Sequence, residues 1–114
     1  MTGNPRILVV DDDTLAREIT ADILRSADCE VLEAADAPQA LNLLAGNRFD
    51  LVLSDVKLPG MDGVELAANI ERVWPNTPVL LTSGEPTQTP PGMRFLAKPC
   101  RPDKLIAAVL AAAR

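Results

Sequence analysis

Residues 7–13, Ile-Leu-Val-Val-Asp-Asp-Asp (ILVVDDD), decide the fold: four consecutive apolar residues are followed by three aspartates. A continuous apolar run of this length, bounded by polar residues, is typical of a strand that is buried on both faces of a sheet. Residues 51–55, LVLSD, repeat the pattern and end in Asp55. Strands covered on both faces belong to parallel sheets, so the two segments predict a parallel sheet with helices on either side.

The rest of the chain alternates between helical and strand patterns. Asp13 or Thr14, Asp36 and Asp62 can each cap the start of a helix. The expected strands cover residues 7–10, 30–34, 51–53, 78–82 and 94–97. The expected helices carry apolar faces made by Leu15, Ile19, Ile23 and Leu24; by Ala40, Leu41 and Leu44; by Leu66, Ile70 and Val73; and by Leu105, Ile106, Val109 and Leu110. Strands that alternate with helices predict the α/β class and a doubly wound, five-stranded parallel sheet.

The composition fits one globular domain over residues 1–114 and excludes several classes of function. Hydrophobic residues make up 47% of the chain and charged residues 24%, as in an ordinary globular protein. No apolar run approaches the roughly 18 residues of a membrane span, and residues 1–6 do not resemble a signal peptide. We therefore expect a cytoplasmic protein with no membrane partner. The net charge of −5 argues against direct nucleic acid binding, and the absence of histidine excludes serine–histidine catalysis and imidazole zinc sites.

Unusual polar residues follow the expected strands: Asp11 and Asp12, Asp55, Ser83 and Lys98. In doubly wound sheets the ligand site lies at the carboxyl ends of the strands, so we expect these side chains to meet. Any one of them alone is usually a helix cap or a turn residue. Three converging carboxylates repel one another unless one is protonated or a cation lies among them, and Mg²⁺ suits such oxygen ligands. A carboxylate in this setting can attack phosphorus, with a lysine and a hydroxyl stabilising the phosphoryl oxygens.

The sequence resembles the receiver domain of two-component response regulators over essentially its whole length. The matching segments are ILVVDDD (7–13), LVLSDVKLPGMDG (51–63), PVLLTSG (78–84) and FLAKP (95–99). The resemblance implies a (βα)5 fold of the flavodoxin or CheY-like kind. It implies that Asp55 accepts a phosphoryl group from a histidine kinase or a phosphotransfer protein. It also implies a signalling module, not an enzyme, that uses Mg²⁺ or Mn²⁺ and acts on a downstream protein of unknown identity.

The resemblance implies roles for individual residues around the phosphoacceptor. Asp11, Asp12 and Asp55 match the acids that bind the metal. The backbone carbonyl of Lys57 would complete the protein's share of the metal shell. Lys98 matches the lysine that pairs with the phosphoryl group.

Four further matches concern the switch between inactive and active states. Ser83 matches the hydroxyl residue that follows the phosphoryl group on activation, and Gly84 the small residue that leaves room for it. Phe95 matches the aromatic switch residue whose rotamer changes with the shift of Ser83. Pro99 matches the proline after the lysine, which is often joined to it by a cis peptide bond. Phosphorylation adds roughly 1.5–2 negative charges, and the response of Ser83 would bias a bistable surface.

The clearest departure from the family lies between the fourth and fifth strands. Receivers usually have a helix there, whereas residues 85–92 read EPTQTPPG. Proline costs about 3 kcal/mol inside a helix, so we expect a Pro-rich loop in place of that helix. The alternative is a single helical turn that starts at Pro86. We therefore expect partner recognition that does not use the surface this helix usually forms with the fifth strand and the last helix.

Two charged residues flank the expected site. Lys57 lies two residues after Asp55, and Glu85 lies two residues after Ser83. In the family such positions tune the hydrolysis of the phosphoryl group. The two side chains either pair across the mouth of the site or are two solvated charges that contribute less than about 1 kcal/mol.

The cysteines and the last helix have simpler interpretations. Cys29 and Cys100 are expected to be reduced and to act as small buried hydrophobes, with a redox sensor as the alternative. Receivers often carry an aromatic residue at the position of Cys100. Trp74 is expected to be half-buried at the end of the third helix. The outer face of the last helix is assigned to Ala107, Ala108, Ala111 and Ala112, and we expect a monomer or a weak dimer.

Three functions compete for this sequence. The complete set of acids, hydroxyl and lysine favours a phosphorylation-dependent receiver. The alternative is a pseudo-receiver, a binding module that acts without phosphorylation and usually lacks one of these groups. An aspartate-nucleophile phosphatase is disfavoured because that class needs a second acid two residues after the nucleophile, where this chain has Lys57.

Overall fold

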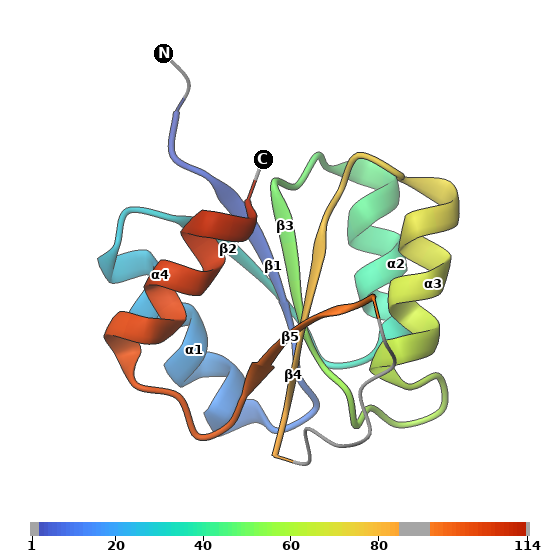
Figure 1. Cartoon of the computed structure of the whole chain (residues 1–114). Helices are drawn as coiled ribbons and strands as arrows, with labels where there is room; N and C mark the ends of the chain where they lie inside the picture. Colours follow the sequence, from blue (N-terminus) through green and yellow to red (C-terminus); the bar gives the residue numbers. More distant parts are fainter. Residues whose placement is uncertain (1–2, 85–91, 114) are drawn as a thin grey trace.

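The computed structural model describes residues 3–84 and 92–113 and shows one parallel sheet between two layers of helices (Figure 1). The strands are β1 (Arg6–Val10), β2 (Glu30–Ala34), β3 (Leu51–Asp55), β4 (Val79–Ser83) and β5 (Arg94–Ala97). The helices are α1 (Thr14–Ser26), α2 (Ala37–Gly46), α3 (Gly63–Val73) and α4 (Pro102–Ala112). The strands pair in the order β2-β1-β3-β4-β5, and every neighbouring pair is parallel. The doubly wound five-stranded sheet that we expected is therefore confirmed.

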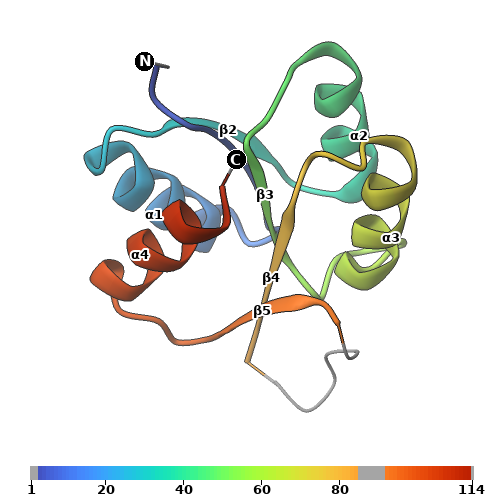
Figure 2. The ribbon, with the colours of Figure 1, turned by 45° about the horizontal axis from the view of Figure 1, so that its top comes forward.

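Helices cover both faces of the sheet, with α1 and α4 on one face and α2 and α3 on the other (Figures 1 and 2). β1 shows how the sequence supports two cores. Successive side chains of a strand point to opposite faces, so Ile7 and Val9 join the core under α1 and α4. Leu8 and Val10 join the core under α2 and α3. The exposed fraction of these four residues ranges from 0% to 2%, as expected for a strand buried on both faces.

Aspartates fix the starts of the first three helices just beyond the ends of the strands. The Asp13 carboxylate accepts a hydrogen bond from the Ala16 amide at 3.1 Å and caps α1. Asp62 accepts one from the Glu65 amide at 2.9 Å, and the Glu65 side chain accepts one from the Asp62 amide, which completes a capping box. Asp36 caps α2 in the same way. These caps confirm the predicted helix starts.

The described residues form four helices, one fewer than a full (βα)5 repeat. Of the segment between β4 and β5, Gly84 and residues 92–93 are described, and none of them is helical. This fits the expectation that the usual fourth helix is missing. The Pro-rich loop itself, and the alternative of a helical turn at Pro86, fall on residues 85–91, outside the described residues. No helix in the described part of the chain is both long enough and apolar enough to cross a membrane.

The buried face of α4 differs from the predicted one. The buried residues are Leu105, Val109 and Ala112, spaced by four and three residues. Leu110 lies about 100° around the helix from Val109 and is 47% exposed, so its assignment to the inner face is wrong. Assigning Ala108 and Ala112 to the outer face is also wrong, because Ala112 belongs to the core under α1 and α4 and the half-buried Ala108 packs against it. The hydrophobic pattern predicted the wrong buried face because alanines complete the buried stripe of α4, whereas Leu110 lies beside this stripe.

Apolar residues near the ends of two other helices also lie outside the core. Leu15 in the first turn of α1 is 67% exposed, and Val73 at the end of α3 is 51% exposed. Ile19 of α1 is 51% exposed. The assignment of Leu15, Ile19 and Val73 to apolar faces that pack in the core is therefore wrong. At Leu15 and Val73 the periodicity extends beyond the contact with the sheet, whereas Ile19 lies in the middle of α1, whose buried residues are Ala21 and Leu24.

Candidate functional site

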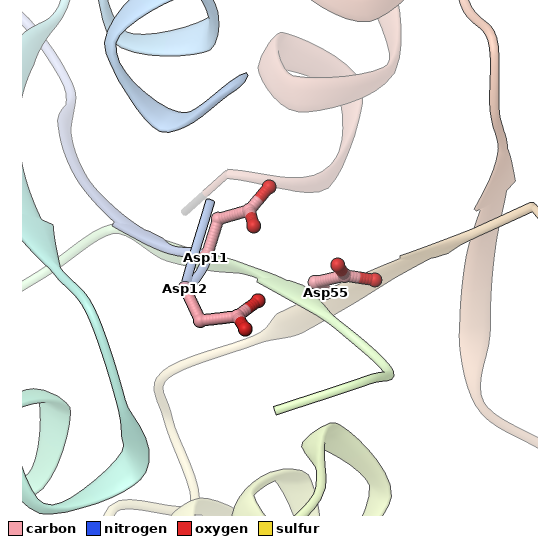
Figure 3. A group of neighbouring side chains, drawn as sticks. All are labelled: Asp11, Asp12 and Asp55. Atoms are coloured by element: carbon pink, nitrogen blue, oxygen red, sulfur yellow. The ribbon is translucent and has the colours of Figure 1, made fainter. Parts of the chain in front are cut away.

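Three carboxylates meet at the carboxyl ends of β1 and β3 (Figure 3). Asp11 and Asp12 directly follow β1, and Asp55 is the last residue of β3. β1 and β3 are parallel neighbours, so their carboxyl ends lie at the same edge of the sheet. One carboxylate oxygen from each residue lies within 4.8 Å of the others. These three residues form what we term the acid cluster.

Lys98 reaches the acid cluster from the end of β5. Its Nζ lies 3.3 Å from Asp55 Oδ2 and 3.6 Å from Asp11 Oδ2. The backbone of Lys98 is anchored to β4, because its amide donates a hydrogen bond to the Ser83 carbonyl at 2.9 Å. The Lys98–Pro99 peptide bond is cis, as the resemblance implied. The lysine therefore bridges two of the three acids and offsets part of their mutual repulsion.

Asp11 is the most buried member of the cluster. Its side chain is 9% exposed, compared with 16% for Asp55, and Asp12 is an exposed residue. Burial raises the pKa of Asp11, while the hydrogen bond from the Asp13 amide and the charge of Lys98 lower it. The negative charges of Asp55 and Asp12 raise the same pKa. A buried carboxylate beside two like charges makes this a site that favours a cation.

Ser83 lies at the same edge of the sheet. Asp55 pairs with Thr82 of β4, so Ser83 is one position further toward the carboxyl edge, where it is 5% exposed. Gly84 follows and is exposed. Phe95 of β5 is half-buried. Ser83 therefore lies at the edge that carries the acid cluster, with the predicted small residue directly after it. Thr82, which the sequence analysis did not single out, is the hydroxyl residue in register with Asp55 and lines the same cleft, whereas the next residue, Ser83, points to the opposite face of the sheet.

The two predicted flanking charges are described only in part. Lys57 is exposed, and its amide donates a hydrogen bond to Asp55 Oδ1 at 3.4 Å. The role expected for its carbonyl stays a prediction. Glu85 falls outside the described residues, so its pairing with Lys57 stays a prediction as well.

Gly63 is a site residue that the sequence pattern did not single out. It begins α3, and its amide donates a hydrogen bond to the Val56 carbonyl at 2.8 Å. A Cβ at this position would collide with the Asp55 carbonyl and lie 2.8 Å from Val56 Cα. Only glycine therefore lets α3 start directly behind the backbone of Asp55. The available signal was a glycine immediately after the cap Asp62.

A cleft of about 670 Å³ opens beside the acid cluster, between α1 and the segment that follows β5. Ile19 and Ile23 of α1, together with Leu96, line its apolar part, and Asp55 is among its polar lining residues. Cys100 also lines this cleft.

The other minor expectations concern the cysteines and the tryptophan. Cys29 is buried, as predicted, whereas Cys100 is only half-buried. Trp74 is half-buried at the end of α3, which confirms its predicted packing role.

Comparisons with known proteins identify relatives of this chain. The response regulator receiver domain family matches residues 7–110. The response regulator protein FleR of Pseudomonas aeruginosa is 42% identical over 76 residues, which are 67% of this chain and 16% of FleR. The sensor histidine kinase RcsC of Escherichia coli is 43% identical over 74 residues, which are 65% of this chain and 8% of RcsC. The chain therefore spans only a small part of the length of these relatives.

Solved structures extend the similarity to nearly the whole chain. The receiver domain of an HD domain-containing protein from Pseudomonas fluorescens has a TM-score of 0.87 and 33% identity, covering 96% of this chain and 94% of that one. The receiver domain of the hybrid histidine kinase CckA has a TM-score of 0.83 and 37% identity, covering 96% and 99% of the two chains. With the family match over residues 7–110, these similarities establish that the chain belongs to the response regulator receiver domain family.

Proposed function

We propose that this chain accepts a phosphoryl group on Asp55 from a histidine kinase or a phosphotransfer protein and then changes the surface that it presents to a partner. The observation that carries the proposal is the Lys98 Nζ–Asp55 Oδ2 contact of 3.3 Å within the acid cluster. Members of the family are signalling modules without a conventional catalytic role. The similarity to a response regulator and to a sensor histidine kinase supports a role in two-component signalling.

The donor set of the acid cluster fits a divalent cation such as Mg²⁺ or Mn²⁺. Carboxylate oxygens are the hard ligands that Mg²⁺ prefers, and the exposure of Asp12 leaves a side of the cluster open to the waters that Mg²⁺ retains. Asp11 and Asp12 would hold the ion, with Asp55 and the carbonyl of Lys57 as further ligands. When bound, the ion supplies positive charge next to the oxygens of the transferring phosphoryl group.

The proposed transfer is a simple displacement at phosphorus. A carboxylate oxygen of Asp55 forms the new bond to phosphorus as the phosphorus–nitrogen bond of phosphohistidine breaks, and the imidazole nitrogen keeps the electron pair. Lys98, already next to Asp55, is placed to pair with a phosphoryl oxygen as charge develops there. A hydroxyl at the end of β4 would then donate a hydrogen bond to another phosphoryl oxygen, and the resulting shift would be passed to Phe95. The resemblance assigns this role to Ser83, and Thr82, in register with Asp55, is the second hydroxyl at this position.

Intact-mass spectrometry after incubation with acetyl phosphate and Mg²⁺ tests the proposal. We expect a gain of one phosphoryl group in the wild type and in Asp22→Asn, whose carboxylate is 79% exposed on α1. We expect none in Asp55→Asn or in the presence of a chelator. Failure of the wild type under conditions that phosphorylate another receiver would favour a pseudo-receiver, and labelling of Asp55→Asn would mean that another residue is the acceptor.

A further inference from the structure

Two arginines of α1 hold the same glutamate of β2. Arg17 Nε lies 3.2 Å from Glu33 Oε1, and Arg25 Nη2 lies 3.3 Å from Glu33 Oε2. Each arginine also donates a hydrogen bond to a main-chain carbonyl. Arg17 Nη1 donates to Asp11 O at 2.9 Å, whereas Arg25 Nη2 donates to Val31 O at 3.0 Å. The two arginines thus differ in one respect that matters here: only Arg17 contacts the backbone of the acid cluster.

Burial also separates the two arginines. The Arg17 side chain is 15% exposed, the Glu33 side chain 25%, and the Arg25 side chain 45%. An ion pair that is largely shielded from water is less screened, and the planar guanidinium can hold a carboxylate and a carbonyl at once. The link from Glu33 through Arg17 to Asp11 is therefore better shielded from water than the link from Glu33 through Arg25 to Val31.

The carbonyl that Arg17 holds sets the geometry of the acid pair. The Asp11 amide donates to the Ala34 carbonyl at 3.1 Å, and Asp11 Oδ1 accepts a hydrogen bond from the Asp13 amide at 3.0 Å. Arg17 donates a hydrogen bond to the Asp11 carbonyl, which is the other backbone polar group of this residue. Because the peptide bond is planar, fixing this oxygen also fixes the plane that carries the nitrogen of Asp12. Asp12 is the exposed acid of the cluster, so its position depends on the orientation of this peptide.

We propose that Arg17, oriented by Glu33, is a positioning residue that holds the Asp11–Asp12 peptide in the orientation that binds a divalent cation. The inference deepens the proposed function and rests on its cation site. A purely structural role, in which the arginine only ties α1 to β2, would instead make Arg17 and Arg25 equivalent.

Cation binding by the unphosphorylated protein distinguishes these roles. Mn²⁺ would be titrated into the full chain and the free ion followed by electron paramagnetic resonance, for the wild type and for Arg17→Ala, Arg25→Ala and Glu33→Gln. Residues that orient metal ligands typically change affinity by about 10–100-fold, so we expect the Kd of Arg17→Ala to rise about tenfold. Arg25→Ala is the matched control, since it also loses a contact with Glu33 and one main-chain hydrogen bond, together with an exposed ion pair to Asp22, and its Kd should match the wild type.

Glu33→Gln keeps the shape of the side chain and removes its charge, which provides a milder variant if Arg17→Ala does not fold. We expect its Kd to lie between those of the wild type and Arg17→Ala. Arg17→Lys should bind no better than Arg17→Ala, because one ammonium cannot reproduce the guanidinium fork. Phosphorylation by acetyl phosphate gives a second readout. The rate in Arg17→Ala should be low at low Mg²⁺ and recover at saturating Mg²⁺.

Three results would overturn the inference: equal Kd values for Arg17→Ala and the wild type, equal losses in Arg17→Ala and Arg25→Ala, or full affinity in Arg17→Lys. If the wild type binds Mn²⁺ and takes up a phosphoryl group while Arg17→Ala binds Mn²⁺ normally, only the inference fails. If the wild type binds no cation, the proposed cation site fails and the inference fails with it.

Discussion

At the scale of single residues, Asp11 occupies a position that disfavours a charged side chain and so lowers the stability of the fold. Its carboxylate is buried beside two other acids, and Lys98 and the Asp13 amide offset only part of that cost, because the net effect is a raised pKa. A fold selected for stability alone would not place a carboxylate there. The unfavourable charge is instead what a cation would relieve.

Asp11 therefore gives a prediction for stability in the presence of a chelator. Its pKa is raised above the ordinary 3.8, so the folded protein binds a proton there more tightly than the unfolded chain does. Stability should fall as pH rises from the ordinary value through the raised pKa. Asp11→Asn keeps an oxygen for the Asp13 amide and removes the charge, so its Tm at pH 7 should exceed that of the wild type by about 2–5 °C.

The advantage of Asp11→Asn should shrink as pH falls through the raised pKa toward the ordinary value of 3.8, because the wild-type carboxyl becomes protonated over this range. Thermal unfolding followed by circular dichroism across this pH range measures the effect. Asp22→Asn removes an exposed acid and should leave the Tm unchanged. A lower Tm for Asp11→Asn than for the wild type at pH 7 would contradict the prediction.

At the scale of helices and strands, the sequence predicted the strands and the helix caps, whereas the buried face of α4 and the long-range contacts were missed. The apolar run at 7–10 predicted a strand buried on both faces, and the predicted acid cluster followed from the ends of parallel strands. The helix caps depend on atoms three residues apart, so the sequence could reveal them too. Gly63 and Arg17 were missed because their importance lies in contacts with the backbones of Asp55 and Asp11, which sequence spacing does not display.

Gly63 carries the prediction at this scale. A Cβ at position 63 would collide with the Asp55 carbonyl, so Gly63→Ala must displace either α3 or the end of β3. We expect a loss of about 1–3 kcal/mol in the free energy of unfolding, the usual range for forcing extra atoms into a packed site. Denaturation by urea measures this loss.

Gly46→Ala is the matched control for Gly63→Ala. Gly46 is the last residue of α2, and a Cβ there meets nothing within 4 Å. This substitution should be neutral or stabilise by up to about 1 kcal/mol, since alanine favours a helix over glycine. Similar free energies of unfolding for the two variants would rule out a special role for the close approach at Gly63. Acetyl phosphate labelling of Gly63→Ala would report whether the displacement also reaches Asp55.

At the scale of the whole molecule, the cleft beside the acid cluster is formed by segments that are far apart in the sequence. Residues of α1, β3 and β5 line it together with Cys100 and Leu105 near the start of α4. Its volume of about 670 Å³ lies next to the core under α1 and α4. Receivers often carry an aromatic residue at the position of Cys100, whose smaller side chain is among those that line this cleft.

Cys100→Phe is therefore expected to stabilise the protein. Cys100 is half-buried and packs against the core that contains Leu105 and Val109, so added apolar atoms would contact existing apolar side chains. Full burial of a phenylalanine contributes about 1.5–3 kcal/mol, and partial burial here should raise the free energy of unfolding by about 1 kcal/mol. Cys100→Ser is the matched control, because it keeps the size of the side chain, adds no apolar surface and should not stabilise. Urea denaturation of both variants at equal pH, with chelator present, measures the difference. A phenylalanine variant less stable than the serine variant would mean that the cleft closes in solution and that the added ring overpacks it.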